Sequence, residues 1–142
     1  MKLRFVIVFA FLILISMFLI FKGYSDREKE KLTAIDDGIS KSTNQFMNHQ
    51  GITYMGLAGQ KDKRFFKVLL KIDREKISFE EFKEVIISYI SSIATYASEN
   101  DWKQGLKPYN FRIEEMVTGN KTPIILVEKS SGTTEIVWKT EW

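Results

Sequence analysis

Residues 77–97, ISFEEFKEVIISYISSIATYA, carry the clearest folding signal in the chain and predict its central helix. Ser78 followed by Glu81 matches a capping box, in which the hydroxyl accepts a hydrogen bond from the Glu81 amide and the carboxylate accepts one from the Ser78 amide. Apolar residues then recur at helical spacing, so we expect the helix to continue to about residue 100. Its inner face is predicted to consist of Phe82, Ile86, Tyr89, Ile90, Ile93 and Ala97.

Strand-like stretches lie on both sides of this helix. Residues 52–58 and 65–72 alternate between two faces, and a polar loop of hairpin length separates them. Three further strands, separated by turn residues that tolerate positive φ, are predicted after the helix at 109–117, 123–128 and 134–141. The resulting order, α-ββ-α-βββ, predicts an α+β domain whose antiparallel sheet has a helix packed on one face.

The segment 26–49 begins with a run of charged residues and then shows one narrow apolar stripe at helical spacing. The stripe consists of Leu32, Ile35, Ile39 and Phe46. We expect this segment to form either a helical stalk or the first helix of the domain. The α+β domain itself is expected over 50–142, which leaves 1–25 as a separate N-terminal segment.

The N-terminal segment contains 17 consecutive residues without a charge, from Phe5 to Phe21, and Ser16 is the only polar one among them. A membrane-spanning helix needs about 20 apolar residues to cross a hydrocarbon core of about 30 Å. Flanking Lys and Arg side chains can extend towards the membrane surface, which allows a slightly shorter run to span. We therefore predict a single transmembrane helix that anchors the protein in the cell membrane through residues 5–21.

The basic tail at Lys2 and Arg4 favours a cytoplasmic N-terminus, which places the C-terminal domain outside the cytoplasm. The alternative is a secretory signal peptide, because Gly23 and Ser25 supply small residues at the −3 and −1 positions of a cleavage site. In that case the domain would be secreted after cleavage near Ser25. The two alternatives differ only in whether the anchor is retained.

The charge distribution argues against nucleic acid as a partner. The formal net charge is +3, with 21 Lys and Arg against 18 Asp and Glu. Three of the basic residues and none of the acidic ones fall within residues 1–22, so the rest of the chain is neutral. A surface that binds nucleic acid needs a basic patch. The absence of cysteine also excludes disulfides and Cys-based zinc sites.

Reactive side chains are few. His49 is the only histidine, and it has no second histidine or cysteine with which to bind a metal. Glu114 and Glu115 are adjacent on a predicted strand, so their side chains point to opposite faces and cannot share a site. We therefore expect no catalytic, cofactor-binding or metal-binding residues, no small-molecule substrate and no enzymatic activity.

The favoured interpretation is a protein-binding or accessory module of a bacterial envelope complex. The heavy use of Ile, Lys, Phe and Glu, with only 2 prolines, is typical of an AT-rich bacterial gene. Aromatic residues are enriched in protein interfaces, so the first candidates for contact with another envelope protein are Phe65, Tyr109, Trp138 and Trp142. Two alternatives are a carboxylate-dependent envelope hydrolase and, if the N-terminal segment is cleaved, a secreted inhibitor or immunity protein.

Overall fold

The computed structural model describes the backbone of residues 2–119 and 122–139 and, within these ranges, all side chains except those of residues 2–10 and 61. The chain forms two compact units, Met1–Thr33 and Ala34–Trp142. The described part of the first unit belongs to the long helix α1 (Lys2–Ser42). The second unit contains the end of α1 and all other elements.

In the first unit, α1 carries the apolar run predicted to anchor the protein. The large apolar side chains from Phe11 to Phe21 are between 41% and 76% exposed. The beginning of the predicted span, residues 5–10, lies outside the described side chains. Over the residues that are described, no helix has a stretch both long and apolar enough to cross a membrane.

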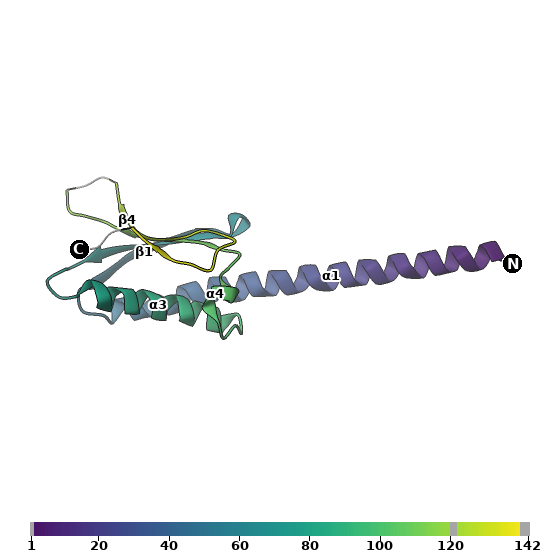
Figure 1. The fold of residues 1–142 in the computed structure, drawn as a ribbon, viewed down its shortest axis with the longest axis horizontal. Helices are drawn as coiled ribbons and strands as arrows, with labels where there is room; N and C mark the ends of the chain where they lie inside the picture. The colour runs from purple at the N-terminus through teal and green to yellow at the C-terminus, as the bar shows by residue number, and fades with distance from the viewer. Residues whose placement is uncertain (1, 120–121, 140–142) are drawn as a thin grey trace. The chain divides into compact units, whose positions relative to one another are not determined.

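The second unit contains a five-stranded sheet with the strand order β1-β2-β3-β4-β5. Figure 1 shows this sheet with β1 and β4 labelled. The strands are β1 (Ile52–Gln60), β2 (Phe65–Ile72), β3 (Asn110–Glu115), β4 (Ile124–Lys129) and β5 (Val137–Trp138). The predicted α+β class is therefore confirmed, and a strand is present in each predicted stretch. β5 covers only two residues of the stretch predicted at 134–141, and residues 140–142 lie outside the described part of the chain.

Besides the end of α1, the second unit contains four helical segments among the described residues, and only α3 is long. They are α2 (Asn44–Met47), a single 3-10 turn η1 between β1 and β2 (Lys61–Lys63), α3 (Phe79–Tyr96) and α4 (Trp102–Gly105). Residues 26–42 thus belong to α1, and α2 follows after one intervening residue, Thr43. The predicted helix after Ser78 corresponds to α3.

The capping box predicted at the start of α3 is confirmed. The Glu81 amide donates to Ser78 Oγ at 3.3 Å, and the Ser78 amide donates to Glu81 Oε2 at 2.8 Å. Five of the six predicted inner-face residues are buried, the exception being Ala97, which is half-buried at the helix end. The helix ends at Tyr96, four residues before the predicted end. Ser98 adopts a left-handed conformation (φ 58°), which terminates the helix.

The prediction of an all-antiparallel sheet is wrong at one junction, because β2 and β3 are parallel. Phe66 lies opposite Phe111 and Val68 lies opposite Ile113 in this ladder, while every other pair of neighbouring strands is antiparallel. The physical reason is the crossover through α3 and α4, which returns the chain to the end of the sheet at which β2 began. β3 therefore runs in the same direction as β2, as in a βαβ unit.

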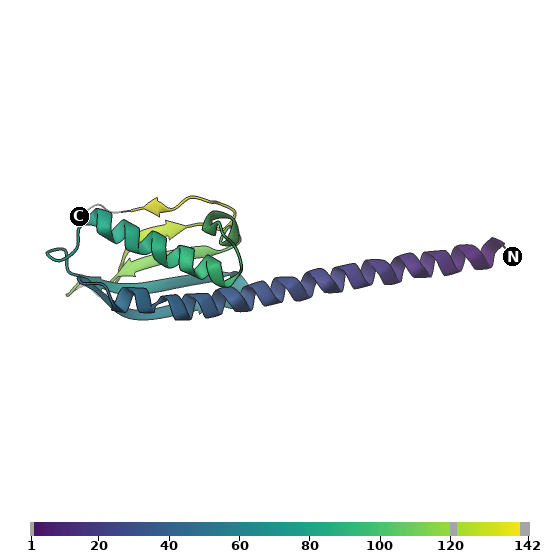
Figure 2. The same ribbon diagram turned by 90° about the horizontal axis from the view of Figure 1, so that it is seen from below.

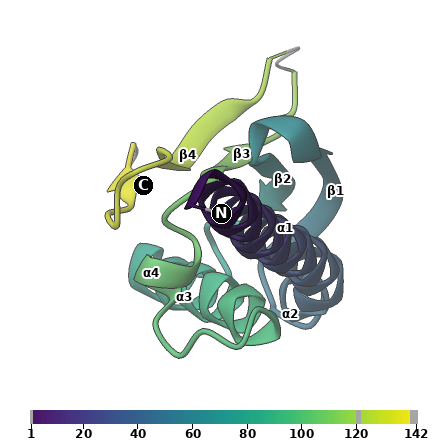
Figure 3. The same cartoon turned by 90° about the vertical axis from the view of Figure 1, so that its right-hand side faces the viewer.

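The helices of the second unit cover one face of the sheet, as predicted (Figures 2 and 3). The ring centroids of Phe46 in α2 and Tyr89 in α3 lie 4.5 Å apart, and those of Tyr89 and Phe111 in β3 lie 6.4 Å apart. The core between these layers is fully enclosed, and its sheet side is formed by Phe66, Val68, Leu70, Phe111, Ile113 and Val127.

Candidate partner-binding face

The sheet face opposite α3 carries no helix in the described part of the chain, and we call it the open face (Figure 1). Its residues alternate along each strand with the buried core residues and align with one another across the strand pairs. They are Phe65, Lys67 and Leu69 of β2, Arg112 and Glu114 of β3, Ile125 and Glu128 of β4, and Val137 of β5.

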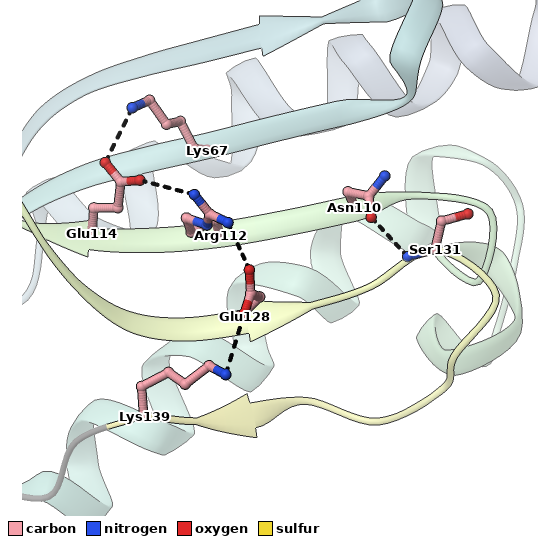
Figure 4. A network of polar contacts seen from close by, with 7 residues as sticks. All are labelled: Lys67, Asn110, Arg112, Glu114, Glu128, Ser131 and Lys139. Atoms are coloured by element: carbon pink, nitrogen blue, oxygen red, sulfur yellow. Dashed lines mark hydrogen bonds and ion pairs between the residues drawn. The ribbon is translucent and has the colours of Figure 1, made fainter.

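A row of alternating charges, which we call the charged ladder, crosses the open face from β2 to the residue after β5 (Figure 4). Lys67 Nζ lies 3.1 Å from Glu114 Oε2, and the other oxygen of Glu114 lies 3.7 Å from Arg112 Nη1. Arg112 Nη2 donates to Glu128 Oε1 at 2.7 Å, and Lys139 Nζ lies 3.3 Å from Glu128 Oε2. Each carboxylate thus contacts a cation on either side.

The electrostatic environment of the ladder differs along its length. Glu114, whose side chain is only 8% exposed, is the most buried member, and the terminal cations Lys67 and Lys139 are the most exposed. The hydrogen bond from Arg112, followed in importance by that from Lys139, lowers the pKa of the Glu128 carboxyl. Paired in this way, Glu128 stays ionised at neutral pH, so it is not poised to act as a general acid.

Phe65 completes the surroundings of Arg112. The guanidinium carbon lies 5.9 Å from the centroid of the Phe65 ring, within the range of a cation–π contact. Arg112 Nε is buried and, among the described residues, has no hydrogen-bond partner. The guanidinium group therefore contacts Glu114, Glu128 and the Phe65 ring, and these three contacts fix its orientation.

The other predicted contact residues do not join Phe65. Tyr109 is 6% exposed and lies in the core. Trp138 is half-buried and packs edge-on against Phe79 and Phe82 of α3, with ring centroids 6.1 and 6.3 Å apart, so it faces the helix layer. Trp142 lies outside the described residues. Of the three described candidates, Phe65 alone belongs to the open face.

Glu115 forms a second ion pair, separate from the ladder. Arg74 Nη1 donates to Glu115 Oε1 at 2.8 Å, and Arg74 Nη2 donates to the other oxygen. This forked arrangement compensates for the burial of Glu115, which is 2% exposed. Glu114 and Glu115 therefore bind different cations on opposite faces, as the strand alternation predicts.

Lys129, at the end of β4, has its amine in the core. The ammonium group donates to the carbonyl oxygens of Leu106 at 2.7 Å and Tyr109 at 3.0 Å, with those of Ser130 and Lys107 at 3.4 and 3.5 Å. Burial lowers the pKa of the Lys129 ammonium to about 8. The amine thus joins the α4–β3 connection to the end of β4, which is a structural role.

The described residues offer little for metal or nucleophilic chemistry. Within them, no group of three or more His, Asp or Glu side chains is placed to hold a metal ion. His49 and Glu84 line a shallow groove of about 450 Å³ beside α2 and α3, and His49 Nδ1 lies 3.1 Å from the carbonyl oxygen of Gln50. The Ser88 hydroxyl lines the same groove, but among the described residues no hydrogen bond joins it to His49, so the serine has no base in position to activate it.

The charged ladder and the buried amine were both missed at the sequence level. Arg112 and Glu114 are two residues apart, so their shared face was predictable from strand alternation. Their partners on β2 and β4 depend on the register between strands, which the sequence does not specify.

Comparison with known proteins finds no match among protein families, curated proteins or solved structures. The function of the chain is therefore inferred from its own residues and contacts.

Proposed function

We propose that the protein is a membrane-anchored, extracytoplasmic module that binds another envelope protein through the open face. The observation that carries this proposal is the uncovered side of the five-stranded sheet, which presents apolar side chains between ordered charges. Phe65, Leu69 and Ile125 are half-buried there, and Val137 is 49% exposed. Protein interfaces combine apolar and aromatic contact area with charges that select the partner, and this face carries both kinds of side chain.

The charged ladder supports a binding role because its side chains are already ordered. Immobilising long side chains on association costs roughly 0.5–1.5 kcal/mol for each. Arg112 is fixed between two carboxylates and Phe65, so little of that cost remains for it. The alternating signs also favour a partner with complementary charges and disfavour other surfaces.

The anchor is supported by the apolar run of α1. A continuous exposed stretch such as Phe11–Phe21 is unfavourable in water and suits a lipid environment or a partner surface. The carboxylate-dependent hydrolase gains no support, because Glu114, Glu115 and Glu128 are each bound to cations. We therefore favour binding without turnover.

Site-specific photo-crosslinking in intact membranes tests the proposed face. A photoreactive residue at Leu69 or Val137 should form an adduct of one defined mass with a second protein. The same residue at Ser88, which is exposed on α3, serves as the matched control and should not form that adduct. An adduct formed from Ser88 but from neither sheet position would contradict a role for the open face.

A further inference from the structure

The outer edge of β1 has no strand partner among the described residues, because β1 is the first strand of the sheet order. β1 is nine residues long and its sequence, ITYMGLAGQ, contains neither a charge nor a proline. Natural proteins usually protect a free edge with charged residues, prolines, short strands or bulges, since unpaired amides and carbonyls are a template for another strand. β1 uses only the last of these protections.

The bulge lies between Tyr54 and Gly56 and divides the strand into two parts. Beyond it, Gly56 to Gln60 pairs regularly with β2 and forms an uninterrupted edge. Side chains in this part are small or exposed, and a Cβ atom added at Gly56 would meet no other atom within 4 Å. Another backbone can therefore approach this edge closely.

We propose that β1 pairs antiparallel with β1 of a second copy of this chain, which joins two sheets into one. A strand without charges pairs with itself without bringing like charges into contact. The proposal goes beyond the binding function of the open face, because it uses a different surface and does not require the anchor.

The charge of the hairpin tip selects the antiparallel arrangement. Residues 61–64 carry three cations and one acid, a net charge of +2 next to the end of β1. Parallel pairing would place the two tips side by side. Antiparallel pairing separates them by roughly the strand length, about 30 Å at about 3.3 Å per residue. That distance exceeds the Debye length of about 8 Å at physiological ionic strength, so their repulsion is screened.

Antiparallel pairing of two identical strands creates a two-fold axis perpendicular to the joined sheet. Rotation about this axis places both open faces on the same side of that sheet. Two copies would then present two binding faces to a partner, which raises the effective affinity for a repetitive or dimeric one. A single pair of strands buries less than the roughly 1,200 Å² typical of stable interfaces, so we expect a concentration-dependent dimer.

Disulfide mapping tests the proposal cleanly, because the chain has no native cysteine. Single cysteines introduced into the full-length protein at Thr53, Leu57, Ala58 or Gln60 are oxidised in membranes and analysed without reductant. Only positions near the two-fold axis bring their Cα atoms within the roughly 4.4–6.8 Å needed for a disulfide. We expect dimer formation to peak at one or two neighbouring positions and to fall off on both sides, with Ser88→Cys on α3 at background.

A charge placed on the edge gives the second measurement. In the best cross-linking background, a lysine at a neighbouring edge position should reduce the dimer to the level of the Ser88 control, whereas glutamine at the same position should not. Thermal unfolding of each variant verifies that the fold is intact. Equal cross-linking at all positions, no cross-linking at any β1 position, or insensitivity to the lysine would overturn the proposal.

Discussion

Lys129 places an ionisable amine in the core, and its titration is expected to control stability in mild alkali. Burial lowers the pKa of its ammonium group to about 8, whereas the ordinary value is 10.5. Between these values the unfolded chain binds more protons than the folded chain, so stability rises with pH. We expect the free energy of unfolding to increase between pH 8 and 9.5, by at most about 1.4 kcal/mol per pH unit.

Urea denaturation at a series of pH values measures this dependence. Lys129→Met should lack the rise, because it removes the titrating group and keeps much of the side-chain volume. The window ends near pH 10, where the raised pKa of the buried Tyr89 phenol acts in the opposite direction. Ionisation of that tyrosine in the unfolded chain alone then lowers stability. Identical profiles for the wild type and Lys129→Met would disprove the assignment.

Ser78 provides a residue-scale test of the α3 cap. Ser78→Ala removes the oxygen that accepts from the Glu81 amide and should lower the free energy of unfolding by about 0.5–2 kcal/mol. Ser88→Ala is the matched control, because Ser88 is exposed in the middle of the same helix. Chemical denaturation should separate the two variants. A control as unstable as Ser78→Ala would point to a cause other than the cap.

Among the elements, the end of α1 and α3 are held together by a close contact at Gly38. A Cβ atom at this position would lie 2.9 Å from the carbonyl oxygen of Ile93 and 3.0 Å from Cβ of Tyr96. Gly38→Ala should therefore destabilise the domain by about 1–3 kcal/mol, despite the gain of about 1 kcal/mol in helix propensity.

Gly23→Ala is the control for this contact, since a Cβ atom added at Gly23 meets nothing within 4 Å. It should be neutral or slightly stabilising by thermal unfolding. If both variants had the same melting temperature, the close approach of the two helices would not contribute to stability.

The elements also mark the limit of sequence-based prediction. Residues close in the chain determine the α3 cap and the strand alternation, and these were predictable. The parallel pairing of β2 with β3 was missed because it depends on where the crossover returns. Lys129 follows the inward alternation of β4, yet a lysine on a strand is usually exposed. Its burial against the carbonyl oxygens of Leu106 and Tyr109 was therefore not predictable.

For the whole molecule, topology is the property to establish first. If α1 anchors the protein with its N-terminus in the cytoplasm, protease added to intact spheroplasts should digest the domain and leave a small membrane-bound fragment. The reason is the uncharged run from Phe5 to Phe21 behind Lys2 and Arg4. Lysed spheroplasts serve as the accessibility control. Complete protection of the domain in intact spheroplasts would reverse the proposed orientation.

The crossover between β2 and β3 also has a consequence for how the domain folds. The β1–β2 and β3–β4 pairs join strands that are close in the sequence. The β2–β3 ladder can form only after residues 73–109, which separate the two strands, have folded into a closed loop. Until then β2 has an unpaired edge of its own, so a partly folded chain is prone to aggregate. The substitution Phe111→Ala should therefore speed unfolding more than it slows folding. Stopped-flow kinetics measures both rates directly. A slowed folding rate with unchanged unfolding would place this junction in the folding nucleus instead.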